Sequence, residues 1–161
     1  MQKKIALPSA QRVILDLRAA DWSNGQTHNL DGYWNTYWSN FIAPADIAST
    51  TVPAIKFPVP GVWSKNPYRF VENQRVDAMQ GDNIRDQQVI YPSLGYATYH
   101  AKALIPKSQT PLYLYVPDMP SAYKLFVNGK LSAQNGEPGF YQSTEEPQFR
   151  PKVIKITEHQ G

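Results

Sequence analysis

Residues 30–38 read Leu-Asp-Gly-Tyr-Trp-Asn-Thr-Tyr-Trp and place two tryptophans and two tyrosines within six positions. Asp31-Gly32 is typical of a turn, so a strand is expected to begin at Tyr33. Alternate residues of a strand share a face, which would bring Trp34 and Trp38 together. Indoles are the largest apolar groups available to fill a sandwich core. We expect Trp34 in the core, whereas for Trp38 a core position and a ligand-stacking position both stay open.

Four later segments alternate apolar and polar residues, as half-buried strands do. They read YATYHAKALI (96–105), PLYLYV (111–116), AYKLFVNGKLSA (122–133) and KVIKIT (152–157). The alternation predicts inward positions for Tyr99, Leu125 and Val127, and Asn128-Gly129 predicts a hairpin turn. The segment RVILDLRAADW (12–22) fits either a short helix or an alternating strand.

The composition favours one β-rich domain. The chain has 161 residues, no cysteine and 14 prolines, about twice the average usage. Prolines end helices and occupy turns and strand edges. The net charge of +3 comes from scattered basic residues, which argues against a nucleic-acid partner. We therefore predict an all-β sandwich or jelly roll spanning residues 1–161.

The titratable residues form no catalytic constellation in the sequence. The histidines are His28, His100 and His159, and no nucleophile motif accompanies them. Glu145 and Glu146 are adjacent on an extended segment, so their side chains would point in opposite directions. Asp82, Asn83 and Asp86 offer oxygen ligands for calcium without the ordered spacing of an EF-hand loop. We expect no enzyme, no cofactor and no metal centre.

The segment from Ser64 to Leu94 is long, polar and poor in apolar runs. Loops of this length are uncommon in compact domains unless they are functional or disordered. Sugar sites combine an aromatic platform with a few polar groups, and arginine would add bidentate recognition of acidic sugars or other carboxylates. The candidate ligand-binding residues are Tyr68, Arg69, Arg75 and Tyr91, together with Tyr141 after the turn at Gly139.

Five motifs in one order resemble a known pattern. They are LDGYW (30–34), VPGVW (59–63), GYATYHAKALIP (95–106), PDMPSAYKLFVNGKL (117–131) and NGEPG (135–139). The order is similar to that of galactose-binding-like jelly rolls, including the sugar-binding domain of family 2 glycosidases. It resembles more closely an ectodomain of the bacterial seven-transmembrane receptors with diverse intracellular signalling modules (7TMR-DISM). The resemblance covers roughly residues 30–150.

This resemblance implies a galactose-binding-like jelly roll on the periplasmic side of the inner membrane that senses a carbohydrate or a related small molecule. It implies structural roles for Trp34 and Trp63 and fixes no binding residues. Such jelly rolls continue into further strands, so we expect an excised piece of a larger membrane receptor that reaches the membrane only through a downstream segment. An open sheet edge would then favour a homodimer or strand exchange. The alternatives are an interaction module that binds no small molecule and an accessory sugar-binding domain of a glycosidase.

Overall fold

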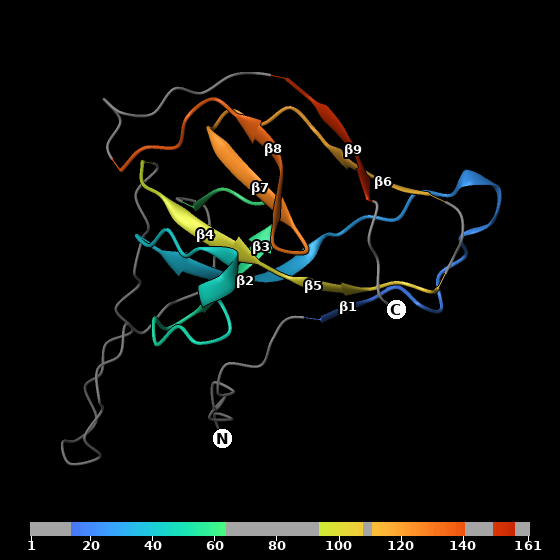
Figure 1. Cartoon of the computed structure of the whole chain (residues 1–161), viewed down its shortest axis with the longest axis horizontal. Helices are drawn as coiled ribbons and strands as arrows, with labels where there is room; N and C mark the ends of the chain where they lie inside the picture. Colours follow the sequence, from blue (N-terminus) through green and yellow to red (C-terminus); the bar gives the residue numbers. More distant parts are fainter. Residues whose placement is uncertain (1–13, 64–93, 108–110, 141–149, 157–161) are drawn as a thin grey trace, which may run out of the picture.

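The computed structural model describes residues 14–63, 94–107, 111–140 and 150–156. These residues form an all-β sandwich with two short 3₁₀ turns, η1 (Ser23–Gly25) and η2 (Pro44–Asp46) (Figure 1). The strands are β1 (Ile14–Asp16), β2 (Gly32–Trp38), β3 (Ile55–Val59), β4 (Ala97–His100), β5 (Lys102–Leu104), β6 (Leu112–Val116), β7 (Tyr123–Val127), β8 (Lys130–Asn135) and β9 (Lys152–Ile156). The all-β prediction is confirmed.

The first layer is built around β2, which pairs antiparallel with β3 on one side and with β4 on the other. Thr36 lies opposite Ile55 of β3 and opposite Tyr99 of β4. Ala101 separates β4 from β5, and β5 pairs in parallel with β1. The segment at residues 14–16 is therefore a strand, which resolves the choice that its sequence left open.

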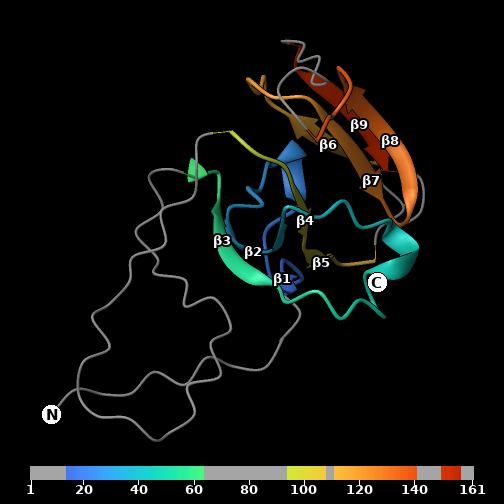
Figure 2. The same ribbon diagram turned by 90° about the vertical axis from the view of Figure 1, so that its left-hand side faces the viewer.

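The second layer consists of two antiparallel pairs, β6 with β9 and β7 with β8. Figure 2 shows β6 to β9 together on one side of the molecule and β1 to β5 on the other. The alternation expected in β6 is present, because Leu112 and Leu114 are half-buried whereas Tyr113 and Tyr115 are exposed. Such an alternating pattern leaves one face of the layer in contact with solvent.

A two-residue turn joins β7 to β8. Asn128 has φ 51° and Gly129 has φ 80°, so both residues adopt the left-handed conformation that a type I′ hairpin turn requires. The predicted hairpin is confirmed. A register shift between Leu125 and Phe126 marks a bulge in this pair.

The buried apolar cluster of the first layer is formed by Ile55 and Phe57 of β3. Trp38, Trp63 and Tyr99 are partly buried and pack against it. The rings of Trp38 and Trp63 meet edge to face, with centroids 4.7 Å apart. The indole N–H of Trp63 donates a hydrogen bond to the Tyr99 hydroxyl, and burial raises the pKa of Tyr99.

The middle of β2 is buried on both faces, since Asn35, Thr36 and Tyr37 are consecutive buried residues. The sequence pattern had suggested only one core-facing side. On the face of β2 that carries Asn35, the buried side-chain amide has a hydrogen-bond partner, because the Lys56 ammonium donates to Asn35 Oδ1. A buried amide needs such a partner to offset its loss of hydration.

Candidate functional site

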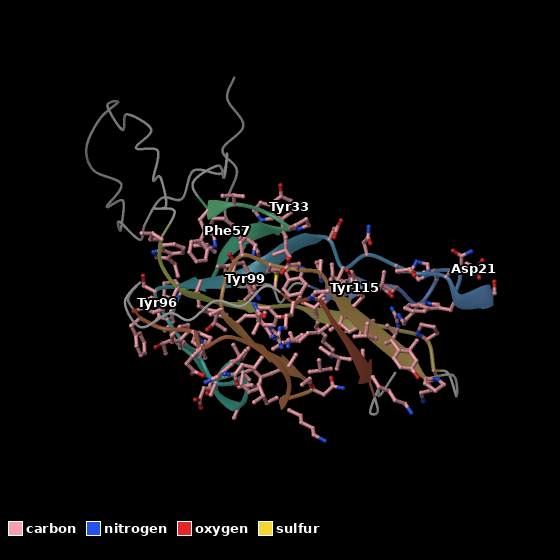
Figure 3. The ribbon with its side chains drawn as sticks, turned by 90° about the horizontal axis from the view of Figure 1, so that it is seen from above. Asp21, Tyr33, Phe57, Tyr96, Tyr99 and Tyr115 are labelled. Atoms are coloured by element: carbon pink, nitrogen blue, oxygen red, sulfur yellow. The ribbon has the colours of Figure 1, made fainter. Side chains whose placement is uncertain are left out.

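Three aromatic rings meet at one end of the sandwich. Phe41 follows β2, Tyr96 precedes β4, and Phe140 follows β8. The ring centroids are 4.8 Å apart for Phe41 and Tyr96, 5.0 Å for Phe41 and Phe140, and 5.2 Å for Tyr96 and Phe140. We call these residues the aromatic end cluster. Figure 3 shows Tyr96 at the opposite end of the molecule from Asp21.

Hydrogen bonds fix the segment that carries Phe41. Thr98 Oγ1 donates to the carbonyl of Asn40 over 2.8 Å and accepts from the backbone N–H of Ile42 over 2.9 Å. Ser39 lies in the left-handed region with φ 54°, and its N–H donates to the carbonyl of Tyr96 over 2.9 Å. One β4 hydroxyl thus holds both neighbours of Phe41, and the ring is held beside the start of β4.

Gly95, the residue before Tyr96, lies against the Trp38 indole. A Cβ atom on Gly95 would lie 2.8 Å from two carbons of the Trp38 indole and 3.6 Å from the ring of Trp63. Real Cβ contacts do not come this near, so only glycine fits the position without displacement. The chain entering β4 therefore lies directly on the Trp38 indole, which carries Tyr96 into contact with Phe41 and Phe140.

The cluster is accessible to solvent. Phe41 is 43% exposed and Phe140 is 59% exposed, and Leu94 nearby in the chain is also exposed. The three rings contact one another, and Tyr96 is half-buried whereas Phe41 and Phe140 remain exposed. Rigid, exposed aromatic rings can receive the apolar C–H face of a sugar or another flat ligand with little loss of side-chain entropy. The cluster therefore has the chemistry of a binding platform.

The ligand-binding residues expected from the sequence are Tyr68, Arg69, Arg75, Tyr91 and Tyr141, and all of them lie outside the described residues. In the chain, Tyr141 directly follows Phe140, and Tyr91 comes five residues before Tyr96. Asp82, Asn83 and Asp86 also lie outside the described residues. The prediction of a site in this region stays a prediction.

The residues expected in the core occupy different environments. Trp63 and Tyr99 pack against Ile55 and Phe57, as described above. Trp34 is half-buried and its indole N–H donates to the Leu30 carbonyl over 3.0 Å. Leu125 and Val127 are half-buried on β7. Trp38 is half-buried and packs with the core cluster and against Gly95, so the second tryptophan of the opening stretch does not form an exposed platform.

The two histidines of the described residues, His28 and His100, lie in different surroundings. His28 donates from Nε2 to the Asp21 carbonyl over 2.6 Å, and its ring lies 4.6 Å from that of Trp22. His100 is half-buried in β4, opposite Asn35, and not on a fully exposed face as its alternation with lysine had suggested. Across the described residues, His, Asp and Glu side chains form no group of three that could hold a metal ion.

No protein-family model matches the chain, and neither a curated protein nor a solved structure does. Among the described residues there is no helix with the length and apolar character needed to span a membrane.

Proposed function

We propose that this chain is a ligand-recognition domain of a bacterial signalling receptor that lies on the extracytoplasmic side of the membrane and binds a carbohydrate or a related small molecule at the aromatic end cluster. The observation that carries the proposal is the convergence of Phe41, Tyr96 and Phe140 from three separate connections, with two of the rings substantially exposed. The order of the jelly-roll motifs supports the class of receptor and the class of ligand.

The chemistry of the cluster suits weak, selective recognition of a sugar. Apolar stacking on the rings would supply contact area, and a few polar groups would fix the orientation of the ligand. Tyr68, Arg69 and Arg75 remain our candidates for those polar groups, and either arginine would extend recognition to acidic sugars. The role is binding without bond-making or bond-breaking, and the signalling output would come from another part of the receptor.

The test compares two pairs of exposed aromatic residues. Wild-type chain is screened on a glycan array, and the best ligand is titrated by calorimetry against F41A/F140A and against the matched control Y113A/Y115A on β6. We expect the first variant to bind at least about tenfold more weakly, equivalent to about 1.4 kcal/mol. The control should bind like the wild type, because its side chains lie on the outer face of the other layer.

Two outcomes would contradict the proposal. One is a folded wild-type chain that retains no glycan or small acidic ligand at any concentration tested. The other is F41A/F140A binding with unchanged affinity. If sedimentation across a concentration range also showed stable self-association, an interaction module would replace the sensor as the best account.

A further inference from the structure

The solvent side of the second layer carries large apolar side chains that are exposed among the described residues. Tyr113 is 62% exposed, Tyr115 is 61% exposed, and Val153 on β9 is 68% exposed. Phe126 on β7 and Leu131 on β8 are also exposed. We call this surface the outer face of the second layer and include in it the exposed Lys155.

Strand pairing places these residues side by side. Tyr115 lies opposite Val153 and Tyr113 lies opposite Lys155 in the β6–β9 pair. Phe126 lies opposite Leu131 in the β7–β8 pair. The two pairs are separate two-stranded sheets. They lie next to each other where β8 passes beside β9 (Figure 2). Neighbouring exposed apolar side chains often mark an interaction site, whereas single exposed apolar residues are common on any protein surface.

The charge on this face points to an anionic partner. Ion pairs in the described part of the chain join Arg18 to Asp16 and Lys124 to Glu137, and neither uses Lys155. Further exposed basic residues lie at strand ends, Lys130 at the start of β8 and Arg150 just before β9. A face-to-face contact with a second copy would set two copies of the same positively charged surface against each other.

We propose that the outer face of the second layer docks onto an anionic lipid surface. Tyrosine suits the boundary between hydrocarbon and water, because its ring is apolar and its hydroxyl is polar. Val153 and Leu131 would enter the boundary beside the tyrosines, and Lys155 would lie at the level of the anionic headgroups. Exposed aliphatic side chains favour lipid over a polysaccharide, which offers them no matching surface. This inference is independent of the aromatic end cluster: Figure 3 shows Tyr115 well away from Tyr96 along the molecule.

The test is flotation of the chain with two kinds of vesicle, pure phosphatidylcholine and phosphatidylcholine with about 30% phosphatidylglycerol. We expect the chain to float with the anionic vesicles and to be released at about 1 M NaCl, where the Debye length falls to about 3 Å. Lys155→Glu should weaken binding at least about fivefold. Lys102→Glu, the same charge change on exposed β5 of the first layer, should leave it unchanged.

The double variant Y113T/Y115T removes the rings and keeps residues that favour β-strands, and we expect it to lose vesicle binding while its circular dichroism spectrum stays that of the wild type. Three results would overturn the proposal: no flotation of the wild type, flotation unchanged by both K155E and Y113T/Y115T, or vesicle-independent binding to polygalacturonate that Y113T/Y115T abolishes. The last result would assign the face to an acidic polysaccharide. F41A/F140A should float like the wild type, so failure here is separable from failure of the sugar site.

Discussion

Gly95 links the core to the aromatic end cluster at the scale of one residue. Its missing side chain lets the backbone lie on the Trp38 indole, and the next residue, Tyr96, is one of the three rings of the cluster. Trp38 cannot move aside freely, because it also packs against Trp63 and the buried pair Ile55 and Phe57. The position of Tyr96 therefore depends on how closely the preceding residue can approach the core.

Gly95→Ala should lower the free energy of unfolding by about 1–3 kcal/mol, the usual cost of overpacking. The measurement is urea denaturation followed by tryptophan fluorescence. Leu94→Ala is the control, since Leu94 is exposed and its truncation should change little. If Gly95→Ala were as stable as the wild type, the close packing of Gly95 on Trp38 would not be a constraint on the fold.

Asp16 and Arg18 form a local pair whose effect is electrostatic. Arg18 donates from Nε to Asp16 Oδ1 over 2.9 Å and from Nη2 to Oδ2 over 2.7 Å. The backbone N–H of Arg18 also donates to Asp16 Oδ1, over 3.1 Å. The guanidinium hydrogen bonds first, and this backbone hydrogen bond second, lower the pKa of Asp16 from its ordinary 3.8 to about 2. Because the folded pKa is depressed, the contribution to stability is complete above pH 3.8 and is lost as the pH falls towards 2.

Arg18→Lys should raise the pKa of Asp16 towards its ordinary value, because an ammonium group cannot make the same two-point contact. The pKa is read from the carboxyl carbon in an NMR titration. Lys102→Met is a suitable control because Lys102 lies on β5 and takes no part in the pair. An unchanged Asp16 pKa in Arg18→Lys would show that the backbone, and not the guanidinium, sets the value.

The hairpin of β7 and β8 shows how local sequence determines an element. Gly129 has φ 80°, and a Cβ atom added there would meet nothing within 4 Å. The cost of a side chain is therefore backbone strain alone, about 1–2 kcal/mol. We expect Gly129→Ala to lower the free energy of unfolding by this amount and Gly129→Asn to lower it by less, because asparagine tolerates the left-handed region. Equal stabilities for the two variants in urea titrations would contradict this account.

The elements that could be predicted are those whose signal lies in neighbouring residues. The alternation of β6 and the Asn-Gly turn each act within a few positions, and both are present as expected. The expected single strand over residues 96–105 is instead divided at Ala101 into β4 and β5. Parallel pairing of β5 with β1 joins segments that are distant in the sequence, so no local pattern could reveal it.

At the scale of the whole molecule, the structure places two exposed apolar surfaces on different parts of the sandwich. The aromatic end cluster could not be read from the sequence, because Phe41, Tyr96 and Phe140 share no motif and meet only in the folded chain. Sequence reasoning indicated neighbouring segments instead, through Tyr91 and Tyr141. A fold that brings connections together at one end can create a site from residues that look unremarkable separately.

The central claim is that the aromatic end cluster is the ligand site. The most direct measurement is an NMR titration of the ¹⁵N-labelled chain with methyl galactoside and, separately, with galacturonic acid. We predict saturable shift changes at the amides of Phe41, Tyr96 and Phe140, with β6 and β9 unaffected. Saturable changes confined to other parts of the chain, or none with either sugar or with any ligand retained on the glycan array, would contradict the claim.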